Sequence, residues 1–227
     1  MLNKCCKVSI YKIAKEFTER VIMSKAQIMS ETRLDFFREL ESIGAGHAAT
    51  ALSEMLFRPV SVKVPQARFC SYDEICQILD GPETIVAGLL VGISADIDGF
   101  ILLVLGEDDA TTLVRSVTGD LADGMSEEEL EEFGTSALKE VANILIGSYI
   151  TAISEMTGLK IEASVPELVF DMAGAILNLL AVAYGDLGDS VLFMETEFSD
   201  RESSFFGHFF LIPDIESCKV LTNRFAV

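Results

Sequence analysis

Two long stretches of the chain repeat their apolar side chains with the period of an α-helix. Over residues 126–156, apolar residues recur three and four positions apart, which indicates one buried helix face. They are Leu138, Val141, Ile144, Leu145, Tyr149 and Ile153. Ser126 and Glu129 have the spacing of a capping box, so we predict that this helix begins at Ser126. A similar pattern predicts a helix over residues 34–56.

The two predicted helices belong to an internal repeat. The residues Ala49 to Met55 resemble Ile150 to Met156 at an offset of 101 positions (156 − 55 = 101). Between positions 34 and 70, 11 of 37 residues are identical to their counterparts at this offset. Chance gives about two or three identities for ordinary composition. We interpret the chain as a tandem duplication, with repeats at about 34–118 and 126–227.

The remaining pattern predicts the same elements in both repeats. In the first we expect a strand ending at the proline, a short helix, a two-stranded hairpin and a closing helix, over residues 60–64, 72–79, 85–93 with 99–105, and 108–117. In the second these are residues 160–165, 173–180, 190–198 with 204–212, and 214–225. Residues 119–124 are expected to link the repeats.

This element order predicts an α+β fold with approximate internal two-fold symmetry. Strands joined by local hairpins favour an antiparallel sheet, against which the two long repeat helices and the shorter helices would pack. Neither repeat is expected to form a domain by itself, because sheet edges that pair across the symmetry axis are protected. We therefore expect residues 29–227 to form a single domain.

The first 28 residues differ from the rest of the chain. Residues 1–25 carry six Lys or Arg and two Glu, a net charge of +4, against −19 for the whole chain. Apolar residues at positions 10, 13, 17 and 21 would suit a short basic amphipathic helix. The alternative interpretations are a disordered extension or an upstream start codon, because Met23 or Met29 could begin the same domain.

Composition excludes several classes of function. A net charge of −19 makes nucleic-acid binding unfavourable. Five cysteines without a CxxC pair favour a reducing cytoplasm, and two isolated histidines give no basis for a metal site. No apolar run reaches the roughly 20 residues of a membrane span. Phosphate-binding loops, nucleophile elbows and dinucleotide motifs are also missing from the sequence.

Each long helix carries a polar stripe opposite its apolar face. In the second repeat the stripe consists of Ser136, Glu140, Asn143 and Gly147. Spacings of four, three and four residues keep all four positions within roughly 60° of arc. The first repeat has Asp35, Glu39, Ser42 and Gly46 at the same spacings. In both repeats 22 residues separate the third stripe position from a proline, Pro65 or Pro166.

This pattern resembles that of the CheC family of chemotaxis phosphatases, together with their relatives CheX and FliY. The family pattern is D/S-x3-E-x2-N-x22-P, normally present twice in CheC. Ser136, Glu140, Asn143 and Pro166 match it fully. Asp35, Glu39 and Pro65 also match, but Ser42 stands in place of asparagine. Residues 43–53 resemble the family's I-G-A-G-N-A-A-T-A-L-S run, with His47 in place of its asparagine.

The resemblance implies a function in which a phosphorylated CheY-like response regulator is the substrate. Glu140 and Asn143 are implied as the catalytic residues, with Ser136, Gly147 and Pro166 in support. An asparagine amide would orient water, and the glutamate would anchor a lysine of the regulator. The protein would need no cofactor or metal of its own, because Mg²⁺ would be bound to the regulator.

The first site and the choice of partners leave alternatives open. A serine hydroxyl reaches less far than an asparagine amide, so Asp35, Glu39, Ser42 and Pro65 are interpreted as a degenerate site that docks a regulator without hydrolysing it. One alternative function is a binding adaptor for a CheD-type deamidase or for a response regulator. A flagellar switch component similar to FliY is another, and it would need a further C-terminal domain.

Overall fold

A computed structural model of the chain describes residues 31–119, 126–184, 190–199, 204–214, 216–217 and 220–221. The extension predicted over residues 1–28 and most of the predicted linker lie outside this part of the chain. So does most of the closing helix predicted over residues 214–225, which is helical at 216–217 and 220–221. Within the described ranges, no helix combines the length and apolar character needed to cross a membrane.

The first repeat contains the predicted helices and hairpin. Its elements are α3 (Glu31–Leu56), β1 (Ser61–Ser71), α4 (Tyr72–Ile78), β2 (Ile85–Ala95), β3 (Gly99–Gly106) and α5 (Glu107–Thr118). Helix α4 begins with a capping box in which Ser71 and Glu74 bond to each other's backbone N–H groups. The long helix α3 begins three residues earlier than expected, at Glu31.

The second repeat follows the same order with one additional strand. Its elements are α6 (Glu127–Thr157), β4 (Ile161–Ala163), β5 (Glu167–Met172), α7 (Ala173–Tyr184), β6 (Ser190–Ser199) and β7 (Ser204–Pro213). The capping box predicted at the start of α6 is confirmed. The Ser126 N–H donates to Glu129 Oε2 at 2.8 Å, and the Glu129 N–H donates to Ser126 Oγ at 3.3 Å.

All seven described strands form one antiparallel sheet with a symmetric order. The order is β1-β6-β7-β3-β2-β4, and β5 also pairs with β2. Strands β3 and β7 are equivalent in the two repeats and pair at the centre, with Leu102 opposite Phe210. The strands that follow each long helix pair with the hairpin of the other repeat, β1 with β6, and β4 and β5 with β2. The predicted α+β architecture and its approximate two-fold symmetry are therefore confirmed.

The prediction that both first strands end at the proline is wrong for the first repeat. Strand β1 continues through Pro65 to Ser71, and its register with β6 shifts between Lys63 and Gln66. A proline is tolerated there because β1 is an edge strand and the irregularity removes the need for a ladder N–H. In the second repeat β4 does end before Pro166, but the chain resumes pairing with β2 as β5, which the sequence pattern did not predict.

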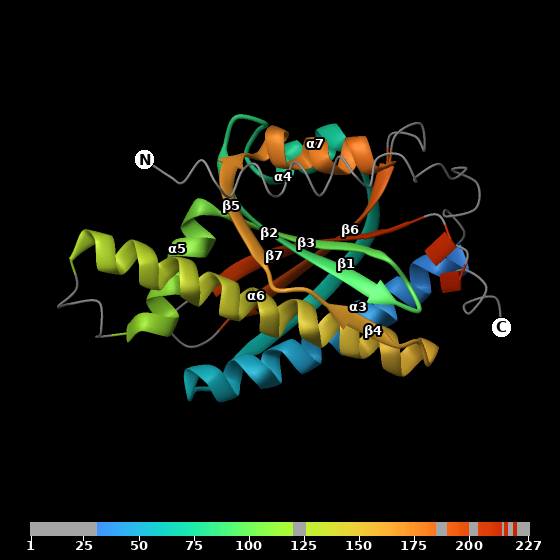
Figure 1. Cartoon of the computed structure of the whole chain (residues 1–227), viewed down its shortest axis with the longest axis horizontal. Coiled ribbons are helices and arrows are strands. Elements are labelled where there is room, and N and C mark those ends of the chain that lie inside the picture. Colours follow the sequence, from blue (N-terminus) through green and yellow to red (C-terminus); the bar gives the residue numbers. More distant parts are fainter. Residues whose placement is uncertain are drawn as a thin grey trace.

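Helices cover both faces of the sheet and bury two apolar clusters (Figure 1). Alternate residues of β3 point to opposite sides: Leu103 and Leu105 face α3, α5 and α6, whereas Leu102 and Val104 face α4 and α7. The cluster under the long helices also contains Tyr149. Buried apolar contacts on one whole face therefore hold α3 and α6 against the sheet and leave their outer faces to solvent.

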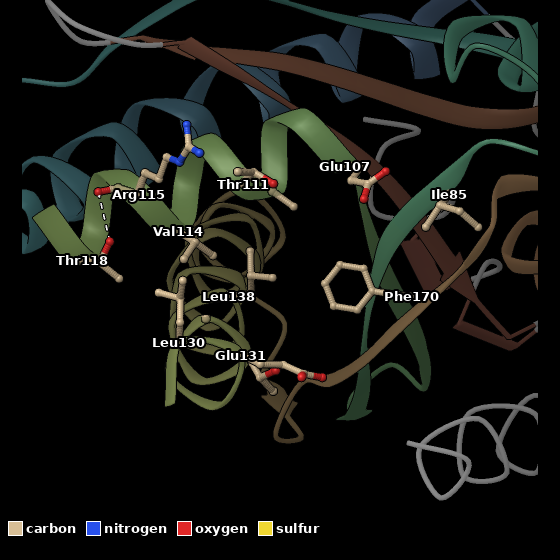
Figure 2. Close-up of a pocket in the computed structure, with 13 residues that line it drawn as sticks. Ile85, Glu107, Thr111, Val114, Arg115, Thr118, Leu130, Glu131, Leu138 and Phe170 are labelled. Atoms are coloured by element: carbon tan, nitrogen blue, oxygen red, sulfur yellow. Dashed lines mark hydrogen bonds between the residues drawn. The ribbon is translucent and has the colours of Figure 1, made fainter. Parts of the chain in front are cut away.

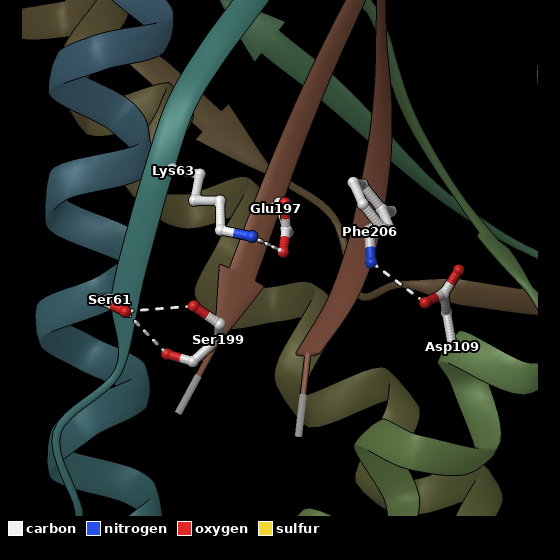
Figure 3. Close-up of polar contacts among 6 residues, drawn as sticks. All are labelled: Ser61, Lys63, Asp109, Glu197, Ser199 and Phe206. Atoms are coloured by element: carbon white, nitrogen blue, oxygen red, sulfur yellow. Dashed lines mark hydrogen bonds and ion pairs between the residues drawn. The ribbon is translucent and has the colours of Figure 1, made fainter. Parts of the chain in front are cut away.

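Polar contacts join the ends of the sheet to neighbouring elements (Figure 3). Lys63 Nζ lies 2.7 Å from Glu197 Oε1, which links β1 to β6. The Phe206 N–H donates to Asp109 Oδ1 at 3.1 Å, so α5 is tied to the backbone of β7. Together with the strand ladder, these contacts connect elements of different repeats.

The two long helices cross closely at a glycine. A Cβ atom added to Gly44 would lie 2.8 Å from Cδ1 of Tyr149, closer than packed atoms approach. The corresponding residues of the other repeat are Leu145 and Ala48, so a small residue and a large one exchange places across the pseudo-symmetry axis. On the far side of the crossing, His47 Nε2 lies 3.8 Å from Glu155 Oε2.

Candidate functional site

The predicted polar stripe of the second repeat lies on the outer face of α6. Ser136, Glu140 and Asn143 are exposed and Gly147 is half-buried. The intervening residues Val141, Leu145 and Tyr149 are buried against α3 and the sheet. Since the opposite face of α6 is fixed in the core, the backbone beneath Glu140 and Asn143 is held in one position.

The functional groups of this stripe are available to a partner. Within the part of the chain that the structure describes, no hydrogen bond or ion pair engages the side chains of Glu140 and Asn143. A Cβ atom added at Gly147 would have no neighbour within 4 Å. Internal packing therefore does not require a glycine at this position, and its small size keeps the helix surface low beside Asn143.

The stripe of the first repeat has the same placement on α3. Asp35, Glu39, Ser42 and Gly46 are all exposed. Asp35 Oδ1 accepts a hydrogen bond from Arg38 Nη1 at 2.9 Å, an exposed pair that contributes little to stability. Helices α3 and α6 cross on one face of the sheet (Figure 1), and each carries its stripe at exposed positions.

The two motif prolines are not on the helices that carry the stripes but in the segments that follow these helices, Pro65 within β1 and Pro166 between β4 and β5. Pro166 is buried in the connection between β4 and β5. Two hydrogen bonds of 2.9 Å join this connection to β2. The Ser164 N–H donates to the Gly92 carbonyl oxygen, and the Gly92 N–H donates to Ser164 Oγ. Pro65 occupies the irregular stretch of β1. The structure thus assigns the prolines to the edge of the sheet.

A cavity beside α6 contains none of the stripe residues in its lining. It has a volume of about 650 Å³ and lies between α5, the first turns of α6, and strands β2 and β5 (Figure 2). Its lining includes Val114, Leu130, Leu138 and Phe170 but none of the stripe residues. The described residues contain no cluster of histidine, cysteine or carboxylate side chains able to hold a metal ion. The candidate site is therefore an open helix face, which suits a protein partner.

A buried carboxyl group beneath the two helices was not predicted from the sequence. Glu41 on α3 has an exposed fraction of 0%. Its Oε1 accepts a hydrogen bond from Thr196 Oγ1 at 3.1 Å, and that hydroxyl lies 2.8 Å from the Tyr149 hydroxyl. Its Oε2 has no hydrogen-bond partner among the described residues. The repeat offered a signal, because Ala142 is the counterpart of Glu41 at the 101-residue offset.

Burial changes the protonation of two groups, one on each face of the sheet: Glu41 under the long helices and His208 on the side of α4 and α7. Desolvation raises the pKa of Glu41 to about 8, despite the hydrogen bond from Thr196 that lowers it. Desolvation likewise lowers the pKa of His208 to about 4, although its Nδ1 is 3.5 Å from Glu195 Oε2. Both side chains are thus neutral near pH 7, and neither leaves an uncompensated charge in the core.

We expect Glu41→Gln to remove part of the pH dependence of stability. The folded state holds a proton on Glu41 between the unfolded pKa of 4.5 and the folded pKa of about 8. Stability from this group is therefore present below pH 4.5 and is lost as pH rises through 8. Glutamine does not titrate, so at pH 9 the free energy of unfolding of the variant should exceed that of the parent by at most about 5 kcal/mol.

Urea unfolding of both proteins at pH 5, 7 and 9 measures this difference, because the stability is lost between the unfolded pKa of 4.5 and the folded pKa of about 8. His208 is unchanged in the variant, so its titration contributes equally to both proteins and cancels in the comparison. Parallel pH profiles for the parent and Glu41→Gln would contradict the assignment of a raised pKa to Glu41.

Sequence comparisons agree with the pattern on α6. The model of the CheC-like family matches residues 133–170, which include Glu140, Asn143 and Pro166. The "CheY-P phosphatase CheC" of Bacillus subtilis (strain 168) is 30% identical over 195 residues, which cover 85% of this chain and 93% of that protein. The "Flagellar motor switch phosphatase FliY" of the same organism is 30% identical over 140 residues, 62% of this chain and 36% of that protein.

Solved structures share the fold. FliY of Thermotoga maritima has a TM-score of 0.66 at 22% identity, covering 87% of this chain and 98% of that one. FliM in a complex from H. pylori has a TM-score of 0.63 at 12% identity, covering 88% and 99%. The identity to CheC over most of both chains shows that this protein belongs to the CheC family, as its sequence motifs predicted.

Proposed function

We propose that this protein is a phosphatase that hydrolyses the aspartyl phosphate of a CheY-like response regulator. The observation that carries this proposal is the exposed, unengaged pair of Glu140 and Asn143 on a helix face fixed by the core. The 30% identity to a protein named CheY-P phosphatase CheC supports the same reaction.

The proposed chemistry requires positioning rather than a covalent intermediate. An aspartyl phosphate is an acyl phosphate, so water attacks phosphorus while the bond to the aspartate oxygen breaks, giving inorganic phosphate and a free carboxylate. The Asn143 amide oxygen accepts a hydrogen bond from the attacking water, and its NH₂ donates another. Such placement of a nucleophile in line with phosphorus is the main contribution that a protein makes to phosphoryl transfer.

Glu140 has a docking role in this proposal. It lies one helical turn from Asn143, on the same face of α6, and its carboxylate would pair with a lysine of the regulator. The Mg²⁺ ion that neutralises the phosphate would be held by the regulator. The flat approach past Gly147 allows the active face of the regulator to reach Asn143.

The first repeat is proposed to dock without efficient hydrolysis. Glu39 is exposed like Glu140, but Ser42 offers only a short hydroxyl where Asn143 offers an amide. A hydroxyl at this position does not reach the same water with both a donor and an acceptor. The second repeat therefore accounts for most of the turnover.

Phosphate release from a phosphorylated CheY-like regulator, with and without this protein, tests the proposal. The regulator is phosphorylated with a small-molecule phosphodonor in Mg²⁺ buffer, and the excess donor is removed. We expect catalytic amounts of the protein to accelerate phosphate release. Release at the regulator's own rate, for each regulator of the same organism, would overturn the proposal.

We expect Glu140→Lys to weaken docking. The substitution replaces attraction to the regulator's lysine with repulsion, so the KM for phosphorylated regulator should rise at least about tenfold. Glu128→Lys is a matched control, because Glu128 is exposed on α6 but about 120° around the helix from Glu140. Equal values of KM for the two variants would show that Glu140 has no docking role.

A further inference from the structure

The residue that follows α3 combines an unusual backbone conformation with full exposure. Phe57 has a φ angle of 52°, in the left-handed region that L-residues with bulky side chains rarely adopt. Its exposed fraction is 96%, by far the highest among the large apolar residues that the structure describes. The aromatic ring therefore adds strain to the backbone without contributing to the core.

The helix end explains why the backbone turns at this position. The Arg58 N–H donates to the Ser53 carbonyl oxygen at 3.2 Å, which is the bond that closes a Schellman motif. The residue before the donor must then be left-handed, and glycine is the usual choice. At the 101-residue offset the second repeat has Gly158, with a φ angle of 70°, in this place.

We propose that Phe57 is an apolar anchor that binds the response regulator beside Glu140 and Asn143. This inference rests on the proposed function, because it takes the regulator as the occupant. A strained residue that performs no internal packing is best explained by a role at an interface. Aromatic side chains provide large contact areas at the centres of protein interfaces.

The long helices cross so that Phe57 and the second site lie on the same side of the crossing. Figure 1 shows α3 and α6 running in opposite directions across one face of the sheet. From the contact of Gly44 with Tyr149, Phe57 lies 13 residues onward (57 − 44), about 20 Å along α3. Glu140 lies nine residues back from Tyr149 (149 − 140), about 14 Å along α6, on the same side of the crossing, where the two helices diverge (Figure 1).

One regulator can cover both features. A protein interface of ordinary size buries about 800 Å² on each partner, a patch of about 16 Å radius. Phe57 directly follows α3, the helix that packs against α6, and its ring is exposed to solvent like Glu140 and Asn143. The first site receives no such anchor, because the equivalent helix end beside α3 carries Gly158. The aromatic anchor therefore accompanies the repeat that has the complete motif.

The test compares Phe57→Gly with the parent in folding and in catalysis. Glycine relieves the left-handed strain, so the urea midpoint should rise, which also shows that the variant is folded. The KM for phosphorylated regulator should rise at least about fivefold while kcat stays within twofold. Phe57→Leu, which keeps an apolar side chain, should have a KM between those of the parent and Phe57→Gly. Met172→Gln, an exposed apolar position next to α7, should leave KM unchanged.

The outcomes separate this inference from the proposed function. A more stable Phe57→Gly variant with unchanged KM would overturn the anchor and leave the phosphatase intact. A fall in kcat alone would also overturn it, because the effect would then lie in the chemistry. If the parent releases no phosphate, the phosphatase proposal fails. Titration calorimetry of both proteins with phosphorylated regulator then decides the anchor, which is refuted by equal affinities.

Discussion

Asn143→Ala is expected to reduce phosphatase turnover at least about 100-fold, the usual loss when a group that stabilises the transition state is removed. Asn143 is exposed and makes no hydrogen bond within the described part of the chain, so its loss leaves no unpaired partner in the protein. Stability should change by less than about 0.5 kcal/mol. The affinity for the regulator should remain, because Glu140 and the rest of the helix face are unchanged.

Single-turnover phosphate release at saturating enzyme separates this effect from binding. Asn178→Ala is the matched control: the same side chain is removed from an exposed position on α7, on the other face of the sheet. Normal turnover of the control together with the loss in Asn143→Ala would assign the water-positioning role. Activity of Asn143→Ala within a few-fold of the parent would remove that role from Asn143.

Local sequence patterns predicted most of the fold because they indicate the same order of elements in both repeats. The helices, both hairpins and the capping box at Ser126 depend on periodicity and end signals within a few residues. Strand β1 beyond Pro65 and strand β5 could not be predicted in this way. A proline disrupts a strand only where its missing N–H would have to donate to a neighbouring strand. On an edge strand one side has no neighbour, and whether a strand lies at the edge depends on the whole sheet.

The candidate site was predictable to the extent that it follows from helix periodicity. Spacings of three and four residues placed Glu140 and Asn143 on one face, and the structure shows that this face is the exposed one. Glu41 and Phe57 were missed because a single position carries no periodic signal. A residue-by-residue comparison of the repeats reveals both. The counterpart of Glu41 is Ala142, an ordinary residue for a buried helix face, and the counterpart of Phe57 is Gly158, the usual residue at a left-handed helix end. Departures from internal symmetry mark the positions where a duplicated chain has specialised.

The first site should recover activity when its missing amide is restored. Ser42 is exposed on α3 at the position equivalent to Asn143, and the helix face around it retains Glu39 and Gly46. Ser42→Asn alone should increase turnover at most about twofold, which is the gain if two equal sites replace one. The change should alter stability by less than about 0.5 kcal/mol because the position is exposed.

An Asn143→Ala background gives the larger and clearer effect, because the second site is then silent. Adding Ser42→Asn should raise phosphate release by up to about 100-fold, the reverse of the loss expected from removing one such group. The control in the same background is Ser42→Ala, which should give no rescue. If the folded double variant shows no rescue, the inactivity of the first site is caused by more than the missing amide at position 42. His47 is then the next residue to replace with asparagine, because it stands where the family's run has asparagine. Its Nε2 lies 3.8 Å from Glu155 Oε2 of α6. If His47→Asn also failed to restore turnover, the first face would be a docking surface only, and hydrolysis would belong to α6 alone.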